Sequence, residues 1–208
     1  MHAGAVDLNG YGVLIGGFPG AGKTSVLARL VEDHGARPVA NDRTVLTPSN
    51  DGGWLATGVP LAWRFTPEGV NGSPRLAEGI RSRYPERGLG LTDGKVELTP
   101  LEVSRILGQP AVATTRVTRV VVLIRLPDDM PETPNAALLQ QRLDFGPADF
   151  FAEDWLGLRS RLGAPPAEQA ATHNWWDKVA ATVPVEVLTW TNPTELARVA
   201  ATIAGERQ

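Results

Sequence analysis

Short apolar runs alternate with amphipathic stretches along the 208 residues of the chain. Residues 6–8 and 13–16 are apolar runs on either side of an Asn9-Gly10 turn signal, which predicts a β-hairpin. Over residues 24–34 the apolar positions recur at the spacing of one helix face, which predicts an amphipathic helix. Because strand and helix patterns continue to alternate, the chain is predicted to have an α/β fold.

The most apolar stretch, residues 117–126, predicts a central buried strand. It contains two arginines and is too short and too charged to be a membrane span. Residues 127–134 predict a loop, and residues 135–182 predict two or three helices. Residues 58–100 are rich in Gly and Pro and are hard to assign. Further short strands are predicted at 38–40, 45–46, 54–57 and 185–190, and further helices at 74–84, 100–107 and 193–204.

Composition narrows the class of protein. With 42% apolar residues the chain is expected to fold, and without cysteine it has no disulfide, no thiolate metal site and no cysteine nucleophile. The 20 basic and 23 acidic residues give a net charge of −3, which is too balanced for a non-specific nucleic-acid binder. The first residues contain no basic segment followed by an apolar run, so we expect a cytoplasmic protein with no membrane partner.

A glycine-rich motif joins the predicted hairpin to the predicted helix. Residues 17–24, Gly-Phe-Pro-Gly-Ala-Gly-Lys-Thr, fit the phosphate-loop pattern G-x-x-x-x-G-K-[ST], with an apolar strand before it and an amphipathic helix after it. Glycines allow the backbone to adopt conformations closed to other residues and to approach phosphate oxygens. The residues expected to bind nucleotide are Gly17, Phe18, Pro19, Gly20, Ala21, Gly22, Lys23, Thr24 and Ser25.

The expected roles follow from the chemistry of phosphate. Amides at the start of a helix, together with its dipole, favour an anion. Lys23 is expected to bridge the β- and γ-phosphates, and the Thr24 hydroxyl to bind Mg²⁺. No motif in the sequence indicates which nucleotide base is recognised, so ATP is the expected nucleotide and GTP the alternative. The structural alternative is a glycine-rich turn that only caps a helix.

An acidic residue is expected to approach the same loop. A strand that follows the motif helix and runs parallel to the strand before it ends at the same sheet edge, which places Asn41 and Asp42 there. Asp42 could then accept a proton from an attacking hydroxyl, or hold Mg²⁺. Taken alone, an Asn-Asp pair would favour a turn. The chain has no apolar strand running straight into Asp and no Asn-Lys-x-Asp motif, which weakens the motor-ATPase and GTPase interpretations.

Residues 2–25 resemble the start of the catalytic domain of the HPr kinase/phosphorylase family, which has a His, a Val-Asp hairpin, and Gly-x-Gly-Val-Leu-Ile before its phosphate loop. The family's Asp-Asp pair corresponds to Asn41 and Asp42, and its Arg-Gly-Leu-Gly segment to residues 87–90. The matching N-terminal positions are His2, Val6, Asp7, Gly10, Gly12, Val13, Leu14, Ile15, Gly17, Gly20, Gly22 and Lys23.

The resemblance implies a P-loop α/β core of the C-terminal-domain type of that family, here with a helical C-terminal elaboration. It implies a Mg²⁺-dependent kinase in which Asp42 is the base and also contacts the metal, Lys23 acts on the phosphates, and His2 and Arg87 lie at the active site. Asn41 replaces the first acidic residue, and residues 135–182 have no counterpart. The acceptor therefore need not be a phosphocarrier protein.

We expect one domain over residues 1–208, with a nucleotide-binding core (1–134), a helical insertion or lid (135–182) and a closing strand and helix (183–208). The expected activity is transfer of the γ-phosphoryl group of ATP to a hydroxyl, on a Ser-like side chain of a peptide or on a small-molecule alcohol. The alternatives are a nucleotide-binding regulator without phosphotransfer and an NTPase that acts on water. A homo-oligomer is left open.

Overall fold

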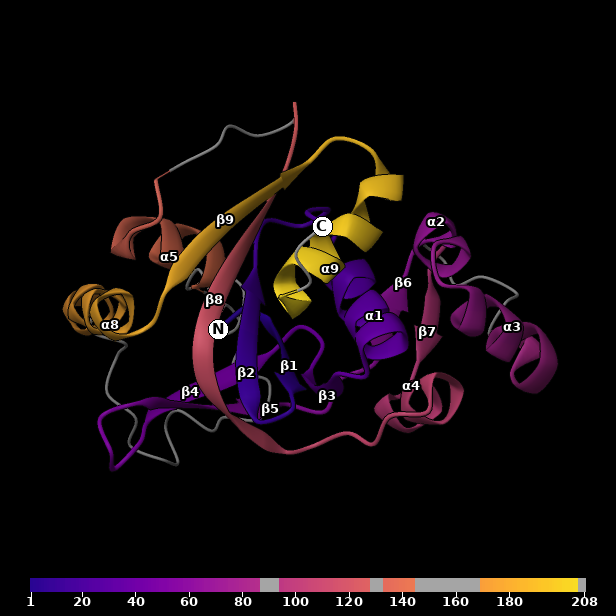
Figure 1. The fold of residues 1–208 in the computed structure, drawn as a ribbon, viewed down its shortest axis with the longest axis horizontal. Coiled ribbons are helices and arrows are strands. Elements are labelled where there is room, and N and C mark those ends of the chain that lie inside the picture. Colours follow the sequence, from indigo (N-terminus) through magenta and orange to yellow (C-terminus); the bar gives the residue numbers. More distant parts are fainter. Residues whose placement is uncertain (87–93, 128–132, 145–168, 206–208) are drawn as a thin grey trace, which may run out of the picture.

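The computed structural model describes residues 1–86, 94–127, 133–144 and 169–205. At its centre is a mixed sheet of seven strands (Figure 1). They are β1 (Gly4–Leu8), β2 (Tyr11–Gly16), β3 (Arg37–Ala40), β4 (Thr44–Pro48), β5 (Trp54–Gly58), β8 (Thr114–Arg125) and β9 (Val185–Trp190). The order is β3-β1-β2-β8-β5-β4, with β9 also paired to β8. The predicted α/β class is confirmed.

The predicted hairpin is present as β1 and β2. The two strands are antiparallel and in register from Gly4 opposite Ile15 to Leu8 opposite Tyr11. Asn9 (φ 56°) and Gly10 (φ 92°) form the turn between them, and both have the positive φ that the favoured two-residue hairpin turn requires. Because β3 is antiparallel to β1, it runs in the same direction as β2, with β1 between them.

Strand β8 is the centre of the sheet. It pairs in parallel with β2 along one edge, while its other edge pairs first with β5, antiparallel, and then with β9, parallel. Its residues Val120 to Ile124 are fully buried, because helices cover both faces of the sheet. A continuous apolar run is typical of a strand buried on both faces, which explains why this strand was predicted from the sequence.

Two helical layers cover the sheet (Figure 1). On one face, α1 (Lys23–His34) and α9 (Leu196–Ala204) pack together, and Leu27, Leu30 and Ile203 share an apolar cluster with Val13 and Ile15. A short 3₁₀ helix, η2 (Pro193–Glu195), precedes α9. On the other face, α5 (Ala136–Leu143) and α8 (Gln169–Thr182) cover Leu14, Val120 and Val122 through the side chains of Leu138, Leu139, Trp176 and Val179.

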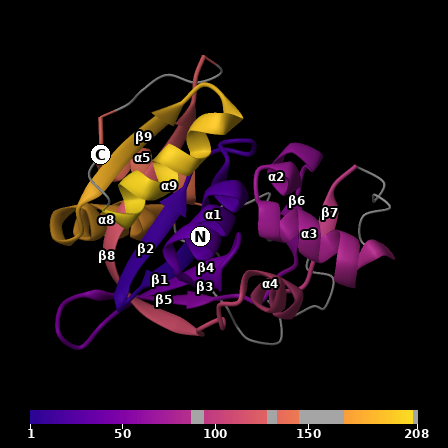
Figure 2. The same ribbon diagram turned by 45° about the vertical axis from the view of Figure 1, so that its right-hand side comes forward.

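A second, smaller unit lies beside α1 (Figure 2). Strands β6 (Trp63–Phe65) and β7 (Val96–Leu98) form a two-stranded antiparallel sheet, accompanied by α2 (Pro67–Asn71), α3 (Pro74–Arg83) and α4 (Pro100–Leu107). Each of these three helices begins with a proline that follows a Thr or Ser cap. Three of the prolines that made residues 58–100 hard to assign are therefore helix starts.

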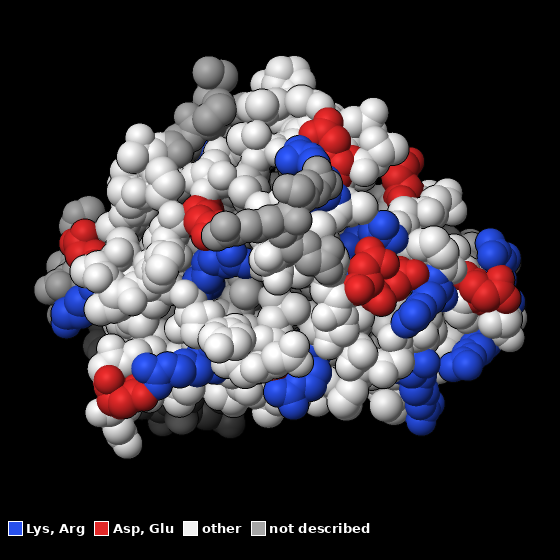
Figure 3. Space-filling view, in the orientation of Figure 1, with Lys and Arg blue, Asp and Glu red and all other residues white. Residues whose placement is uncertain are grey.

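The surface and the helices give two further observations. Acidic and basic side chains are interspersed on the face seen in Figure 3, most densely on the right, over the unit that contains α2, α3 and α4. Within the ranges that the structure describes, no helix has the length and apolar character needed to cross a membrane.

The buried carboxylate of Asp7 links the β1–β2 hairpin by hydrogen bonds to the neighbouring strands β3 and β8. Only 4% of Asp7 is exposed, and it accepts hydrogen bonds from Gly10 N (3.0 Å), Arg37 Nη2 (2.7 Å) and Thr115 Oγ1 (2.7 Å). Burial alone would raise the pKa of Asp7, but the donors from Arg37, Thr115 and Gly10 outweigh it and hold the pKa below its usual value. Asp7 therefore stabilises the fold in its ionised form.

We predict that Asp7→Asn lowers the free energy of unfolding by about 2 kcal/mol, because a buried carboxylate bound by three donors becomes neutral. Asp51→Asn is the matched control, since Asp51 forms an exposed ion pair with Arg116 and should contribute less than about 1 kcal/mol. Urea titrations measure both. The Asp7 contribution should be complete above pH ~4 and be lost as the pH falls below that value. Equal losses in the two variants would contradict this role.

Candidate active site

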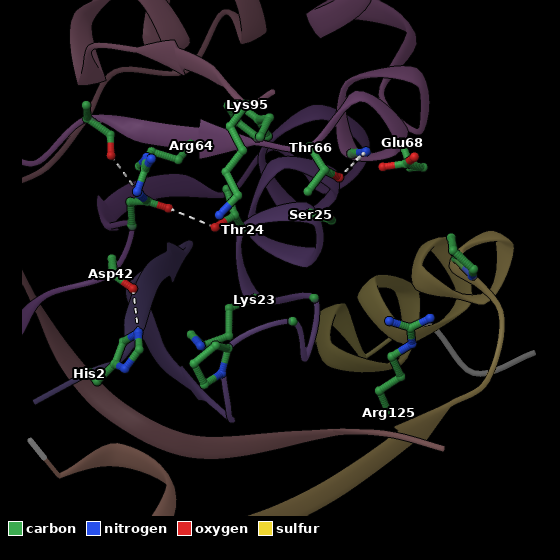
Figure 4. A pocket seen from close by; sticks show the side chains of 18 of the residues that line it. His2, Lys23, Thr24, Ser25, Asp42, Arg64, Thr66, Glu68, Lys95 and Arg125 are labelled. Carbon is green, nitrogen blue, oxygen red and sulfur yellow. Dashed lines mark hydrogen bonds and ion pairs between the residues drawn. The ribbon is translucent and has the colours of Figure 1, made fainter. Parts of the chain in front are cut away.

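A cavity of about 820 Å³ opens where several strands end. Strands β2, β3, β8 and β9 run in the same direction, and the residues at or just after their carboxyl ends line the cavity together with the start of α1 and the edge of the β6–β7 sheet. In open α/β sheets this edge is where ligands bind. The charged and hydroxyl-bearing residues of the pocket are labelled in Figure 4.

The glycine-rich loop (residues 17–22) forms the floor of the pocket. Gly17 (φ 139°), Gly20 (φ 85°) and Gly22 (φ 88°) all have the positive φ that disfavours other residues. Space is also limited at two of them, because a Cβ on Gly17 would lie 2.7 Å from the Leu123 carbonyl oxygen and one on Gly22 would lie 3.2 Å from the Trp190 ring. The loop therefore requires the glycines that the motif supplies.

Two side chains distant in sequence support this loop. The indole Nε1 of Trp190, at the end of β9, donates to the Ala21 carbonyl oxygen at 3.0 Å. On the other face of the sheet, the buried guanidinium of Arg142 lies 3.8 Å from the centre of the Phe18 ring. From the sequence, Trp190 is expected only in a strand, and Arg142 only as a candidate lid arginine, not as a support of this loop. Neither contact can be predicted from the residues next to the loop, because each partner is far from the loop along the chain.

The start of α1 places positive charge, on the side chain of Lys23, at the floor of the pocket. Lys23, only 7% exposed, donates from Nζ to the carbonyl oxygens of Gly17 (2.7 Å) and Phe18 (3.2 Å). Burial lowers the pKa of the Lys23 ammonium to about 8, although the nearby Asp42 carboxylate acts in the opposite direction. The helix cap, Gly22, has no side chain to bond the free amides of the first turn, so these amides and their dipole can attract an anion.

Oxygen donors suited to a divalent cation lie beside Lys23. The Thr24 hydroxyl donates to Asn41 Oδ1 at 3.3 Å, and Asn41 Nδ2 donates to the Ala62 carbonyl oxygen at 3.0 Å. Asn41 is buried, so this chain of hydrogen bonds fixes the Thr24 hydroxyl at the pocket wall. Hydroxyl, amide and carboxylate oxygens fit Mg²⁺, which usually takes one or two protein ligands and completes its shell with phosphate oxygens and water.

No group of three His, Cys, Asp or Glu side chains within the described ranges could hold a metal ion by itself. A Mg²⁺ ion in this pocket would complete its coordination with phosphate oxygens and water. Thr24, Asn41 and Asp42 are pocket residues on one wall whose side-chain oxygens could contribute to it.

Asp42 follows β3 and lines the pocket with its side chain 33% exposed. Its Oδ1 is 2.7 Å from His2 Nε2, and its Oδ2 accepts a hydrogen bond from Arg43. Burial tends to raise the pKa of Asp42, but the hydrogen bond from His2 and the charges of His2, Arg43 and Lys23 lower it by more. Asp42 is thus ionised at neutral pH, and each oxygen retains a lone pair for another partner.

The structure brings most of the expected site residues into one pocket. His2, Pro19, Gly20, Gly22, Lys23, Thr24, Ser25 and Asp42 line it, while Gly17, Phe18 and Ala21 complete the loop behind them. Arg87 lies outside the described residues. Three pocket cations were not expected from the sequence: Arg64 on β6, Lys95 before β7 and Arg125 at the end of β8. With Lys23, they outnumber the acidic lining residues Asp42 and Glu68.

No protein-family model matches the chain, and a search of curated proteins also finds no match. Among solved structures, the chain is similar to the HPr(Ser) kinase/phosphatase of Coxiella burnetii. The two are 20% identical, the match covers 64% of this chain and 72% of that one, and the TM-score is 0.39. This is a distant structural likeness, and the chemistry of the pocket follows from its own residues.

We predict that inorganic sulfate, an anionic probe whose own charge is constant between pH 7 and 9.5, binds more weakly above pH 8. The lowered pKa of Lys23 means that the free ammonium loses its proton near that pH, so Kd should be flat below pH 8 and rise about tenfold per pH unit above it. Isothermal titration between pH 7 and 9.5 measures this. Lys23→Ala should bind weakly with no such rise; the same pH dependence in that variant would assign the titration to another group.

Proposed function

We propose that this protein is an ATP·Mg²⁺-dependent kinase that transfers the γ-phosphoryl group to a hydroxyl. The observation that carries the proposal is one pocket that holds both the Lys23 ammonium, at the start of α1, and the ionised Asp42 carboxylate. A cationic loop alone would support nucleotide binding. A carboxylate at the same sheet edge adds a group that can accept the proton of an attacking hydroxyl.

The phosphates of the nucleotide are proposed to lie on the glycine-rich loop. The free amides at the start of α1 and the Lys23 ammonium would hold the β- and γ-phosphates, since both direct positive charge into the pocket. Thr24, Asn41 and Asp42 would hold Mg²⁺, which when bound neutralises charge on the phosphates. Phosphoryl transfer depends mostly on such positioning and charge neutralisation.

In the proposed reaction, the acceptor oxygen forms a bond to the γ-phosphorus while the bond from that phosphorus to the β–γ bridging oxygen breaks. ADP leaves, and the hydroxyl proton passes to an Asp42 carboxylate oxygen. Because the pKa of Asp42 is lowered, the carboxylate orients the hydroxyl first and takes its proton as the new bond forms. His2 holds Asp42 in place through the 2.7 Å contact to Oδ1.

The acceptor is proposed to enter beside Asp42, where Leu61, Ala62 and Arg64 form the adjoining pocket wall. This wall combines apolar surface with one cation. A Ser-like side chain of a peptide and a small-molecule alcohol are both compatible with it. The resemblance of residues 2–25 to the HPr kinase/phosphorylase family supports the same class of reaction.

One observation favours a second candidate, a nucleotide-binding regulator without phosphotransfer. Asn41 occupies the position that corresponds to the first residue of the Asp-Asp pair in the HPr kinase/phosphorylase family. Its amide nitrogen donates to the Ala62 carbonyl oxygen, a bond that an ionised Asp could not make. The site is thus built around an amide at this position. An NTPase that acts on water is the remaining alternative.

Incubation of the protein with γ-labelled ATP, Mg²⁺ and an extract of its own cells separates these functions. Label on any acceptor supports the kinase. Tight ATP binding without transfer supports the regulator, and release of labelled phosphate at the same rate with and without extract supports the NTPase. Mass spectrometry of the labelled fraction then identifies the acceptor as a peptide or a small molecule.

We predict that Asp42→Asn lowers the turnover number by about 10² to 10⁴, because the proton acceptor is lost. The affinity for ATP should change little, since the loop and Lys23 remain. Asp33→Asn provides the control, because Asp33 pairs with Arg29 on α1 and does not line the pocket. Steady-state kinetics and equilibrium ATP binding measure the two quantities; near-native turnover of Asp42→Asn would remove Asp42 as the base.

A further inference from the structure

The distribution of lysine is unusual in this chain. Its 20 basic residues are arginines except for Lys23, Lys95 and Lys178. Two of these three lysines line the same pocket, whereas Lys178 lies on α8 at the other face of the sheet. Lysine differs from arginine in carrying a compact point charge on a flexible stem. The chain thus uses lysine mainly where this pocket needs a cation.

The two pocket lysines come from independent elements. Lys23 begins α1 on the floor, and Lys95 directly precedes β7 in the small sheet above it. In Figure 4 the Lys95 side chain extends from that sheet across the pocket toward Thr24. Thr24 follows Lys23 in the first turn of α1, next to the amides and the ammonium that are proposed to hold the β- and γ-phosphates, and its hydroxyl is a proposed Mg²⁺ ligand.

Packing of the small β6–β7 sheet fixes the position of the Lys95 backbone. Trp63, Phe65, Val96 and Leu98 are buried in the same apolar cluster as the residues of α1. Side chains alternate along a strand, so Lys95 and Glu97 project from the face opposite Val96 and Leu98. On that face Glu97 forms an ion pair with Arg64 at 2.9 Å. The base of Lys95 is therefore held rigidly relative to the glycine-rich loop.

We infer that Lys95 is a second phosphate-binding cation, which contacts the γ-phosphoryl oxygens from the side opposite Lys23. This inference rests on the proposed function and assigns a catalytic residue to it. Charge spreads over the oxygens of the transferred group during reaction, and a cation already in place stabilises that charge. The same contact makes the pocket prefer a nucleoside triphosphate over a diphosphate, since only the triphosphate reaches Lys95.

Binding measurements test this contact without relying on turnover. Isothermal titration with Mg²⁺ compares ADP with a non-hydrolysable ATP analogue that has an imido group between the β- and γ-phosphorus atoms. The wild type should bind the analogue more tightly than ADP. Lys95→Met should weaken analogue binding by about tenfold and leave ADP binding within about twofold, because one charged contact to the γ-phosphate is lost.

Three variants serve as comparisons. Lys95→Arg keeps the charge and should retain part of the preference for the triphosphate. Lys178→Met removes the lysine outside the pocket and should change neither affinity. Arg125→Met removes a pocket cation that lies over the Trp190 ring, 5.4 Å from its centre, at a different part of the wall, and should leave the triphosphate preference intact. Circular dichroism and thermal melting show whether each variant is folded.

Lys95→Met should also lower the turnover number by about 10² to 10³, the usual loss when one donor to a developing charge is removed. Equal weakening of ADP and analogue binding in Lys95→Met, or no change in either, would overturn the inference. If Lys95→Met loses the preference for the triphosphate while Asp42→Asn keeps near-native turnover, the role of Lys95 is supported and the role of Asp42 as the base is overturned. A wild-type protein that binds neither nucleotide would overturn both the proposed function and this inference.

Discussion

The buried ammonium of Lys23 is the constraint around which the site is arranged. An ammonium removed from water must be compensated, and the carbonyl oxygens of Gly17 and Phe18 do so only because the loop bends back over the start of α1. That bend requires glycines with positive φ, and its outer side is fixed by the Trp190 indole. The Asp42 carboxylate adds longer-range compensation, and the same attraction lowers its own pKa.

Strand direction explains why the site assembles from separate segments. Strands β2, β3, β8 and β9 all run toward the pocket, whereas β1 runs away from it. Because β1 begins at that edge, His2, which precedes it, comes within 2.7 Å of Asp42, which follows β3. Arg125 and Trp190 arrive at the ends of β8 and β9. A single sheet edge thus gathers residues from both ends of the chain.

The sequence predicts those features whose cause is local. The hairpin has its own turn residues, α1 has a helical apolar stripe and a Gly35 cap, and β8 contains the continuous apolar run 120–124. Asp42 could be placed because a helix and a return strand of similar length bring the chain back to the loop. The Trp190 and Lys95 positions depend on contacts between distant segments, and the β6–β7 sheet forms among prolines and glycines that conceal its pattern.

The hydrogen bond from Trp190 to Ala21 has a consequence for protein synthesis. Ala21 is made 169 residues before its partner Trp190, which lies in β9, the last strand of the described sheet. Until β9 has been made and has docked on β8, the loop lacks the indole that fixes it. A nascent chain in which Trp190 has not yet been made would therefore hold this loop less firmly than one in which β9 has docked, so the loop reaches its final order only after this strand is in place.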